Sequence, residues 1–138
     1  MNAGLESNLL STSLTSSIST HQHLKNMSEQ FGCSEDIISR FAMSLSMKNG
    51  AVNREWQPQP LNKGLTVLKG KVIKGKTLFK SELPLFLVML AVAEPEAETH
   101  EVRELLRLHW ERGVETMVKG MGNLDWLEYL SNQFYLVK

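Results

Sequence analysis

The chain has 138 residues, a formal net charge of zero and 42% hydrophobic residues. This length accommodates one domain with a single core, and the composition excludes disordered, collagen-like and disulfide-rich proteins. The lone cysteine, Cys33, cannot form an internal disulfide. The longest apolar run, Leu83–Ala93, is far shorter than the roughly 20 residues that span a bilayer, and the N-terminus lacks the pattern of a secretory signal. We therefore expect a single cytoplasmic domain that does not enter the membrane.

The zero net charge conceals one strongly basic segment. Residues 1–62 carry a net charge of −1 and residues 82–138 a net charge of −5, whereas residues 63–81 carry +6 and contain no acidic residue. Such a segment is a candidate for binding a polyanion, because clustered lysines attract phosphate groups. The candidate nucleic-acid-binding residues are its six lysines: Lys63, Lys69, Lys71, Lys74, Lys76 and Lys80.

The N-terminal segment is rich in serine and threonine, and its apolar residues are widely spaced. We expect residues 1–18 to be extended or disordered. Ser19 and Gln22 have the spacing of a capping box, and Gly32 suits a left-handed C-terminal cap. A first helix is therefore expected over residues 20–31.

The next helix and the basic segment differ in their periodicity. Ser34 precedes a periodic apolar segment that predicts a second helix over Glu35–Lys48, ending before Gly50. Residues 50–80 lack a 3.6-residue period and are interrupted by glycines and prolines, so we expect a loop or a short hairpin. The pairs of adjacent apolar residues in this segment would pack against the rest of the domain, and its lysines would point into solvent.

Two longer helices are expected in the second half of the chain. Ser81 is the expected cap of a helix that carries Pro84 in its first turn and ends at Pro95. This helix is apolar nearly all round, which indicates a central position. Thr99 is the expected cap of the next helix, which ends near Gly120.

The helix expected after Thr99 has one continuous, mostly apolar face. Its residues are Val102, Leu105, Leu106, His109, Trp110, Gly113 and Met117. A last short helix would contain Leu124, Leu127 and Leu130. The expected fold class is mainly α. Residues 19–138 would form one compact domain of about five helices, with the Lys/Gly-rich loop or hairpin between the second and third helices.

Residues 70–77 match the pattern G-x-x-x-x-G-K-[ST] of phosphate-binding loops. In a nucleotide-binding enzyme Lys76 would contact the terminal phosphates and Thr77 would hold magnesium. That loop needs a strand before it and a helix after it, but Ser81 and Pro84 begin a new helix only a few residues later. We therefore favour an anion-binding lysine segment, and a small nucleotide hydrolase is the main enzymatic alternative.

Elsewhere the polar residues do not form a recognisable catalytic set. His21, His23 and His100 do not have the spacing of three or four metal ligands. Cys33 is the only thiol, and a small residue in a turn is preferred to a nucleophile. Trp56 lies in a proline-rich loop, where it could stack on a partner. We expect no catalytic residue, metal or cofactor, and no enzymatic activity.

Two short motifs resemble those of one family. Residues 32–42 read Gly-Cys-Ser-Glu-Asp-Ile-Ile-Ser-Arg-Phe-Ala, and residues 109–113 read His-Trp-Glu-Arg-Gly. They resemble the DNA sulfur modification protein DndE family, in which an arginine-bearing helix follows a glycine, and histidine-x-x-arginine-glycine lies near the C-terminus. The resemblance covers residues 24–118. The chain departs from the family at residues 34–36, where Ser-Glu-Asp replaces threonine-proline-asparagine, and in the lysine repeat between the motifs.

The resemblance implies a small subunit of the bacterial machinery that replaces a non-bridging phosphate oxygen of DNA with sulfur. A cysteine desulfurase and an iron–sulfur protein would perform the chemistry, while this component binds DNA and self-associates. We therefore predict an accessory subunit that contacts the phosphate backbone of double-stranded or nicked DNA without sequence specificity.

A homo-oligomer, either a dimer or a tetramer, is also expected, because the nearly all-apolar helix leaves apolar surface to bury. The second alternative is a protein-interaction module without DNA binding, whose lysines meet the acidic C-terminal half of a neighbour.

Overall fold

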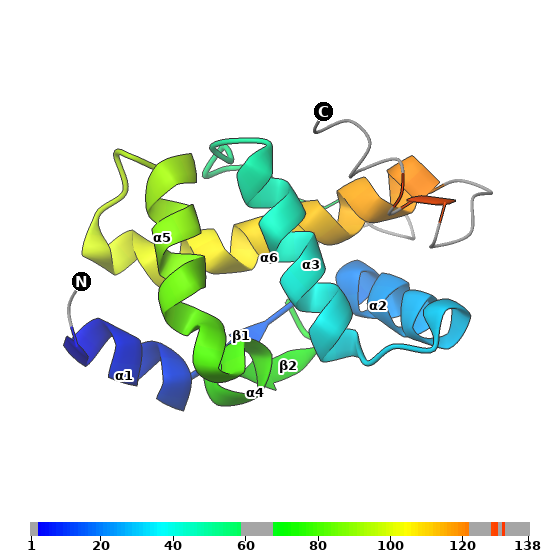
Figure 1. Ribbon diagram of the computed structural model, residues 1–138, viewed down its shortest axis with the longest axis horizontal. Helices are drawn as coiled ribbons and strands as arrows, with labels where there is room; N and C mark the ends of the chain where they lie inside the picture. The colour runs from blue at the N-terminus through cyan, green and yellow to red at the C-terminus, as the bar shows by residue number, and fades with distance from the viewer. Residues whose placement is uncertain (1–2, 59–67, 122–127, 130, 132–138) are drawn as a thin grey trace.

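The computed structural model describes residues 3–58, 68–121, 128, 129 and 131. Figure 1 shows α3 crossing in front of α6, with α5 next to α3, α2 at the opposite end, and α1, α4 and a two-stranded sheet along one edge. The mainly α fold class is confirmed. None of the described helices combines the length and the apolar character needed to cross a bilayer.

The elements in chain order are α1 (Ala3–Ser11), β1 (Ser13–Thr15), α2 (Ile18–Phe31), α3 (Glu35–Lys48), β2 (Val72–Lys74), α4 (Gly75–Phe79), the 3₁₀ turn η1 (Lys80–Glu82), α5 (Leu83–Ala93), the 3₁₀ turn η2 (Thr99–Glu101) and α6 (Val102–Met121).

The N-terminal segment is more ordered than its composition predicts. The expectation of an extended or disordered segment is wrong for Ala3–Ser11, which forms α1, and Ser13–Thr15 forms β1. The reason is burial of the spaced apolar side chains: Leu9 is 3% exposed and Leu14 is 5% exposed, and both belong to the main core. Sparse apolar residues suffice here because α1 packs against α4 and β1 pairs with β2.

The caps of the first two long helices follow general helix-capping chemistry. α2 begins two residues earlier than expected, because the hydroxyl of Ser17, and not that of Ser19, accepts a hydrogen bond from the Thr20 amide. Gly32 ends α2 with φ of 70°, as expected for a left-handed cap. α3 has the expected bounds, and Ser34 caps it by accepting from the Ile37 amide.

Within the expected loop or hairpin over residues 50–80, residues 50–58 and 68–71 lie outside helices and strands, but β2 takes part in a long-range pairing and not in a local hairpin. β2 pairs antiparallel with β1, with Leu14 opposite Ile73, so its partner strand comes from the N-terminal segment. The local spacing of apolar pairs could not reveal this partner, because it lies about sixty residues earlier in the chain. The short helix α4 follows β2 directly.

Helix α5 is peripheral, which corrects the expectation of a central helix. It begins at Leu83 after the turn η1, so Ser81 does not cap it, and its proline lies in the first turn as expected. One face is buried, but Leu85, Val88 and Val92 are 56%, 55% and 79% exposed.

The core centres on the crossing of α3 and α6. The two backbones approach so closely there that a Cβ on Gly113 would lie 1.8 Å from the carbonyl oxygen of Ala42. Trp110 is fully buried beside this contact and donates its indole N–H to the hydroxyl of Ser39 at 2.9 Å. The expected cap Thr99 is replaced by Glu98, which forms a capping box with Glu101. The last expected helix, around residues 124–130, lies largely outside the described residues.

Candidate nucleic-acid interface

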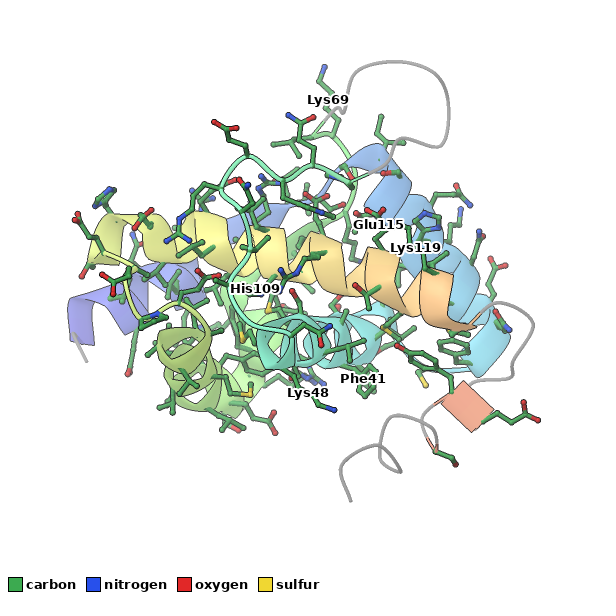
Figure 2. All side chains as sticks on the ribbon, turned by 90° about the horizontal axis from the view of Figure 1, so that it is seen from above. Phe41, Lys48, Lys69, His109, Glu115 and Lys119 are labelled. Atoms are coloured by element: carbon green, nitrogen blue, oxygen red, sulfur yellow. The ribbon has the colours of Figure 1, made fainter. Side chains whose placement is uncertain are left out.

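The structure places five of the six candidate lysines on or next to β2 and α4. Lys63 lies outside the described residues. Lys69, which precedes β2, is exposed, and Figure 2 shows its side chain extending away from the helices. Lys74, Lys76 and Lys80 are exposed as well. Within the described part of the chain, none of these four forms an ion pair.

The direction of these side chains follows from the strand and from the helix after it. Successive side chains of a strand point to opposite faces, and Ile73 is buried while Val72 and Lys74 are exposed. α4 is held in place by Arg40, whose guanidinium donates to the carbonyl oxygen of Leu78 at 2.8 Å. The buried residues of β2 and α4 thus anchor the segment and leave the lysines in solvent.

Lys71 differs from its neighbours. Its ammonium lies 3.6 Å from Oε1 of Glu35, and the Lys71 side chain is only 26% exposed. The same carboxylate oxygen lies 3.7 Å from Nε2 of His21. Lys71 therefore already has an anionic partner inside the molecule.

The backbone of residues 70–77 does not form a phosphate-binding loop. The Gly70 amide donates to the carbonyl of Ser16 at 2.9 Å, the Lys71 amide to the hydroxyl of Ser16 at 2.8 Å, and the Gly75 amide to the carbonyl of Thr12 at 2.9 Å. Amides that are already paired cannot cradle an anion. Both glycines are explained by close packing: a Cβ on Gly70 would lie 2.1 Å from the Ser17 carbonyl oxygen, and one on Gly75 would lie 1.8 Å from the Leu9 carbonyl oxygen.

Residues 109–113, which resemble a family motif, serve the fold. His109 is buried; its Nε2 lies 2.7 Å from Oε2 of Glu94, and its Nδ1 lies 2.8 Å from Oγ of Ser46. Arg112 donates to the same Ser46 hydroxyl, so that hydroxyl donates its proton to Nδ1 and the His109 Nε2–H donates to Glu94. The group has the residue types of a Ser–His–acid triad, but Ser46 and His109 are 0% exposed and no substrate can reach them.

Burial and neighbouring charges set the protonation states of this cluster. Burial lowers the pKa of His109 more strongly than Glu94 raises it, and the cations Arg112 and Arg54 lower it further. Burial alone would raise the pKa of Glu94, but hydrogen bonds from the Val52 amide, His109 and Arg54 together lower it. The cluster therefore holds a neutral imidazole against an ionised carboxylate.

The other polar residues of the motif bind backbone groups at helix ends. Arg112 donates to the carbonyls of Ser46 and Gly50, each at 2.7 Å, which satisfies acceptors at the C-terminal end of α3. Glu111 is fully buried and accepts a hydrogen bond from the Ser17 amide at the start of α2. Arg107 forms an ion pair with the other oxygen of Glu111.

The remaining candidates of the sequence do not converge on a second site. Cys33 is half-buried and lines a small apolar cavity of about 100 Å³ next to Phe31 and Phe41. His100 lies 3.4 Å from Glu98 at the surface. Among the described residues, no three His, Cys, Asp or Glu side chains come together as metal ligands do. Trp56 is half-buried against the core.

Sequence reasoning missed Glu35 and Ser16, which contact Lys71, and Glu94, which belongs to the buried His109 cluster. Glu94 and Glu35 appear in the sequence as ordinary acids at helix ends, and their partners are distant along the chain. Ser16 was part of a serine-rich stretch without periodicity. Only the lysine cluster had a local signal, because charge density can be read without knowing the fold.

Comparison with solved structures supports the fold, and comparison with family models gives the family. The crystal structure of DndE from Escherichia coli B7A, a protein involved in DNA phosphorothioation modification, is similar, with a TM-score of 0.57 and 19% sequence identity. The alignment covers 78% of this chain and 97% of that one. No curated protein sequence matches the chain. The model of the family "DNA sulphur modification protein DndE" matches residues 14–123, which is most of the chain. The chain therefore belongs to the DndE family of DNA sulphur modification proteins.

Proposed function

We propose that this protein is a DNA-binding subunit of a DNA phosphorothioation system, and that it contacts the phosphate backbone through Lys69, Lys74, Lys76 and Lys80. The observation that carries the proposal is the exposure of these four ammonium groups on one short, anchored segment without ion-pair partners among the described residues. Family membership supplies the biological context. The similar E. coli protein is involved in the same modification.

The chemistry of the segment favours backbone contact over base readout. Lysine presents a compact charge that pairs with a phosphate from many directions, whereas reading of base edges relies mostly on planar side chains that form paired hydrogen bonds. The exposed positions of β2 and α4 carry lysine and no arginine, asparagine or glutamine. We infer binding that is independent of sequence and accepts double-stranded or nicked DNA.

We also propose that the protein binds and does not catalyse. A nucleotide hydrolase that uses Lys76 and Thr77 would need free amides along residues 70–77. The amides of Gly70, Lys71 and Gly75 are instead paired with the N-terminal segment. The sulfur chemistry would then belong to other subunits of the system, which are the expected protein partners.

Self-association is part of the same proposal. α5 exposes three large aliphatic side chains, Leu85, Val88 and Val92, and soluble monomers rarely present such residues together. We infer a homo-oligomer, a dimer or a tetramer, in the cytoplasm.

A pair of matched variants tests the DNA-binding proposal. The double variant Lys74→Ala/Lys76→Ala removes two charges from the segment, and Lys25→Ala/Lys48→Ala removes two charges from exposed positions on α2 and α3. In a fluorescence anisotropy titration with labelled duplex at low salt, the first variant should bind markedly more weakly than the parent. The control should bind within about twofold of the parent. Equal weakening in both variants would show that net charge matters and the segment does not, and absence of binding by the parent would favour the protein-interaction alternative.

A further inference from the structure

One carboxylate oxygen lies where three distant segments of the chain meet. Oε1 of Glu35, in the first turn of α3, lies 3.6 Å from the ammonium of Lys71 and 3.7 Å from Nε2 of His21. His21 belongs to α2, and Lys71 directly precedes β2. An ammonium and an imidazole that converge on one oxygen have the chemistry of an oxyanion site, and here the oxyanion belongs to the chain itself.

The Glu35 carboxylate fills this position poorly. Both distances exceed those of a hydrogen bond, so electrostatic attraction alone holds the carboxylate near Lys71. Oε1 is shielded from solvent, yet it accepts no hydrogen bond from the described part of the chain. A carboxylate oxygen that has lost water without gaining a donor is costly. Another oxyanion that accepts hydrogen bonds at this position would therefore compete well with Glu35.

The backbone of Lys71 is fixed in a position that directs its side chain to this site. Its amide donates to the hydroxyl of Ser16 at 2.8 Å, and its carbonyl accepts from the Ser16 amide at 2.8 Å. Because side chains alternate along an extended chain, Lys71 lies on the side of the buried Ile73, and Lys74 lies on the opposite side. This alternation explains why Lys71, and not Lys74, meets Glu35.

A ligand can reach the site from solvent. The side chains of Lys71 and His21 are 26% and 41% exposed, and that of Glu35 is 23% exposed. A displaced Glu35 side chain would remain in the first turn of α3, where the helix favours a negative charge. Release of the carboxylate therefore does not leave it in an unfavourable place.

We propose that Lys71 and His21 form an oxyanion site for a phosphate group, which the Glu35 carboxylate occupies in the free protein and from which DNA displaces it. This inference rests on the proposed function and deepens it, because the phosphate group comes from the DNA backbone. Glu35 is then an internal competitor, and DNA gains the Lys71 contact only when that carboxylate is released. A free phosphate ion presents the same oxygens, so both sources of phosphate are tested.

Inorganic phosphate tests the site without DNA. Glu35→Ala vacates the position, so the imidazole NMR signals of His21 should shift and saturate with phosphate at constant pH and ionic strength. The parent and the exposed control Glu29→Ala should need at least about fivefold more phosphate, because their own carboxylate competes. Glu35→Ala/Lys71→Ala should not saturate. Absence of saturation in Glu35→Ala would overturn the oxyanion site, and equal affinity in the parent would overturn its occupation by Glu35.

A double-variant cycle on duplex binding tests whether DNA uses the site. Lys71→Ala should weaken binding at least about threefold more in a Glu35→Gln background than in the parent, where it also removes the competing ion pair. Equal effects in both backgrounds would overturn the role of the site in DNA binding. A parent that does not bind duplex would overturn the proposed function, and the phosphate titration then decides the oxyanion site alone. Circular dichroism should show native helix content in every variant.

Discussion

Nε2 of His109 lies 2.7 Å from Oε2 of Glu94, and the two side chains join α6 to the C-terminal end of α5 inside the core. Oε1 of the same carboxylate accepts a hydrogen bond from Arg54, and Oε2 also accepts one from the Val52 amide. A buried carboxylate with this many donors is stabilised only while all of them are in place. The contact thus fixes α5, α6 and the loop after α3 as one unit.

Stability should fall as the pH falls from about 7.5 to about 5. The folded-state pKa of His109 is lowered by burial, so below its ordinary value of about 6.5 the unfolded chain binds more protons than the folded one. The lowered pKa of Glu94 acts in the same direction below about 4.5. Urea unfolding at several pH values measures this slope. Burial also lowers the pKa of His23, so His109→Gln should flatten the slope without abolishing it, and an unchanged slope would contradict this assignment.

Removing the charge of Glu94 should destabilise the fold strongly. Glu94→Gln keeps one acceptor oxygen but places an amide NH2 group against either Arg54 or the His109 Nε2–H and the Val52 amide. At least one buried donor or acceptor is then unpaired, with an expected loss of about 1–3 kcal/mol of unfolding free energy. Glu96→Gln, two residues along and exposed, should change it by less than about 0.5 kcal/mol. Chemical denaturation of both variants makes the comparison, and similar values for the two would show that the cluster does not stabilise the fold.

Gly113→Ala should disturb the crossing of α3 and α6. The added Cβ would lie 1.8 Å from the Ala42 carbonyl oxygen, and backbone cannot swing aside as a side chain does. A loss of at least about 1–3 kcal/mol in unfolding free energy is expected. Gly120→Ala on the same helix meets only the ring of Tyr129, at 3.0 Å, and should be close to neutral because alanine favours the helix. Thermal unfolding of the two variants distinguishes a packing effect from a general helix effect.

Glu35→Gln should strengthen DNA binding. Glu35 pairs with Lys71 at 3.6 Å, and loss of its charge frees this lysine for a phosphate. The slope of log affinity against log salt should then become steeper by about 0.9, the value for one more phosphate contact on duplex. Glu29→Gln, at an exposed position on α2, is the control for the change in net charge. If both variants gain affinity equally, the ion pair does not restrain Lys71.

The sequence predicted the features that depend on local chemistry. The bounds of α3, its cap Ser34 and the left-handed cap Gly32 depend on residues within one helical turn, and all three are confirmed. The lysine segment was found from charge alone. These signals need no knowledge of which distant residues come together.

The features that were missed depend on long-range contacts. The pairing of β1 with β2 joins residues far apart in sequence, and α1 is stabilised by burial of Leu9 in the core formed by later elements. The buried position of Glu94 depends on His109 and Arg54, which no spacing rule connects. α5 was expected to be central because its sequence is apolar on both faces, yet Leu85, Val88 and Val92 on one of these faces are exposed.

The salt dependence of duplex binding tests the central claim most directly. The variant Lys69→Ala/Lys74→Ala/Lys76→Ala/Lys80→Ala should lose up to about four phosphate contacts, so its log–log slope should be shallower than that of the parent by up to about 3.6. The loss of affinity should be similar for unrelated DNA sequences, because phosphate contacts carry no base information. Folding should be unchanged, since these side chains are exposed. If this well-folded variant shows the same affinity and slope as the parent, the lysine segment does not bind DNA.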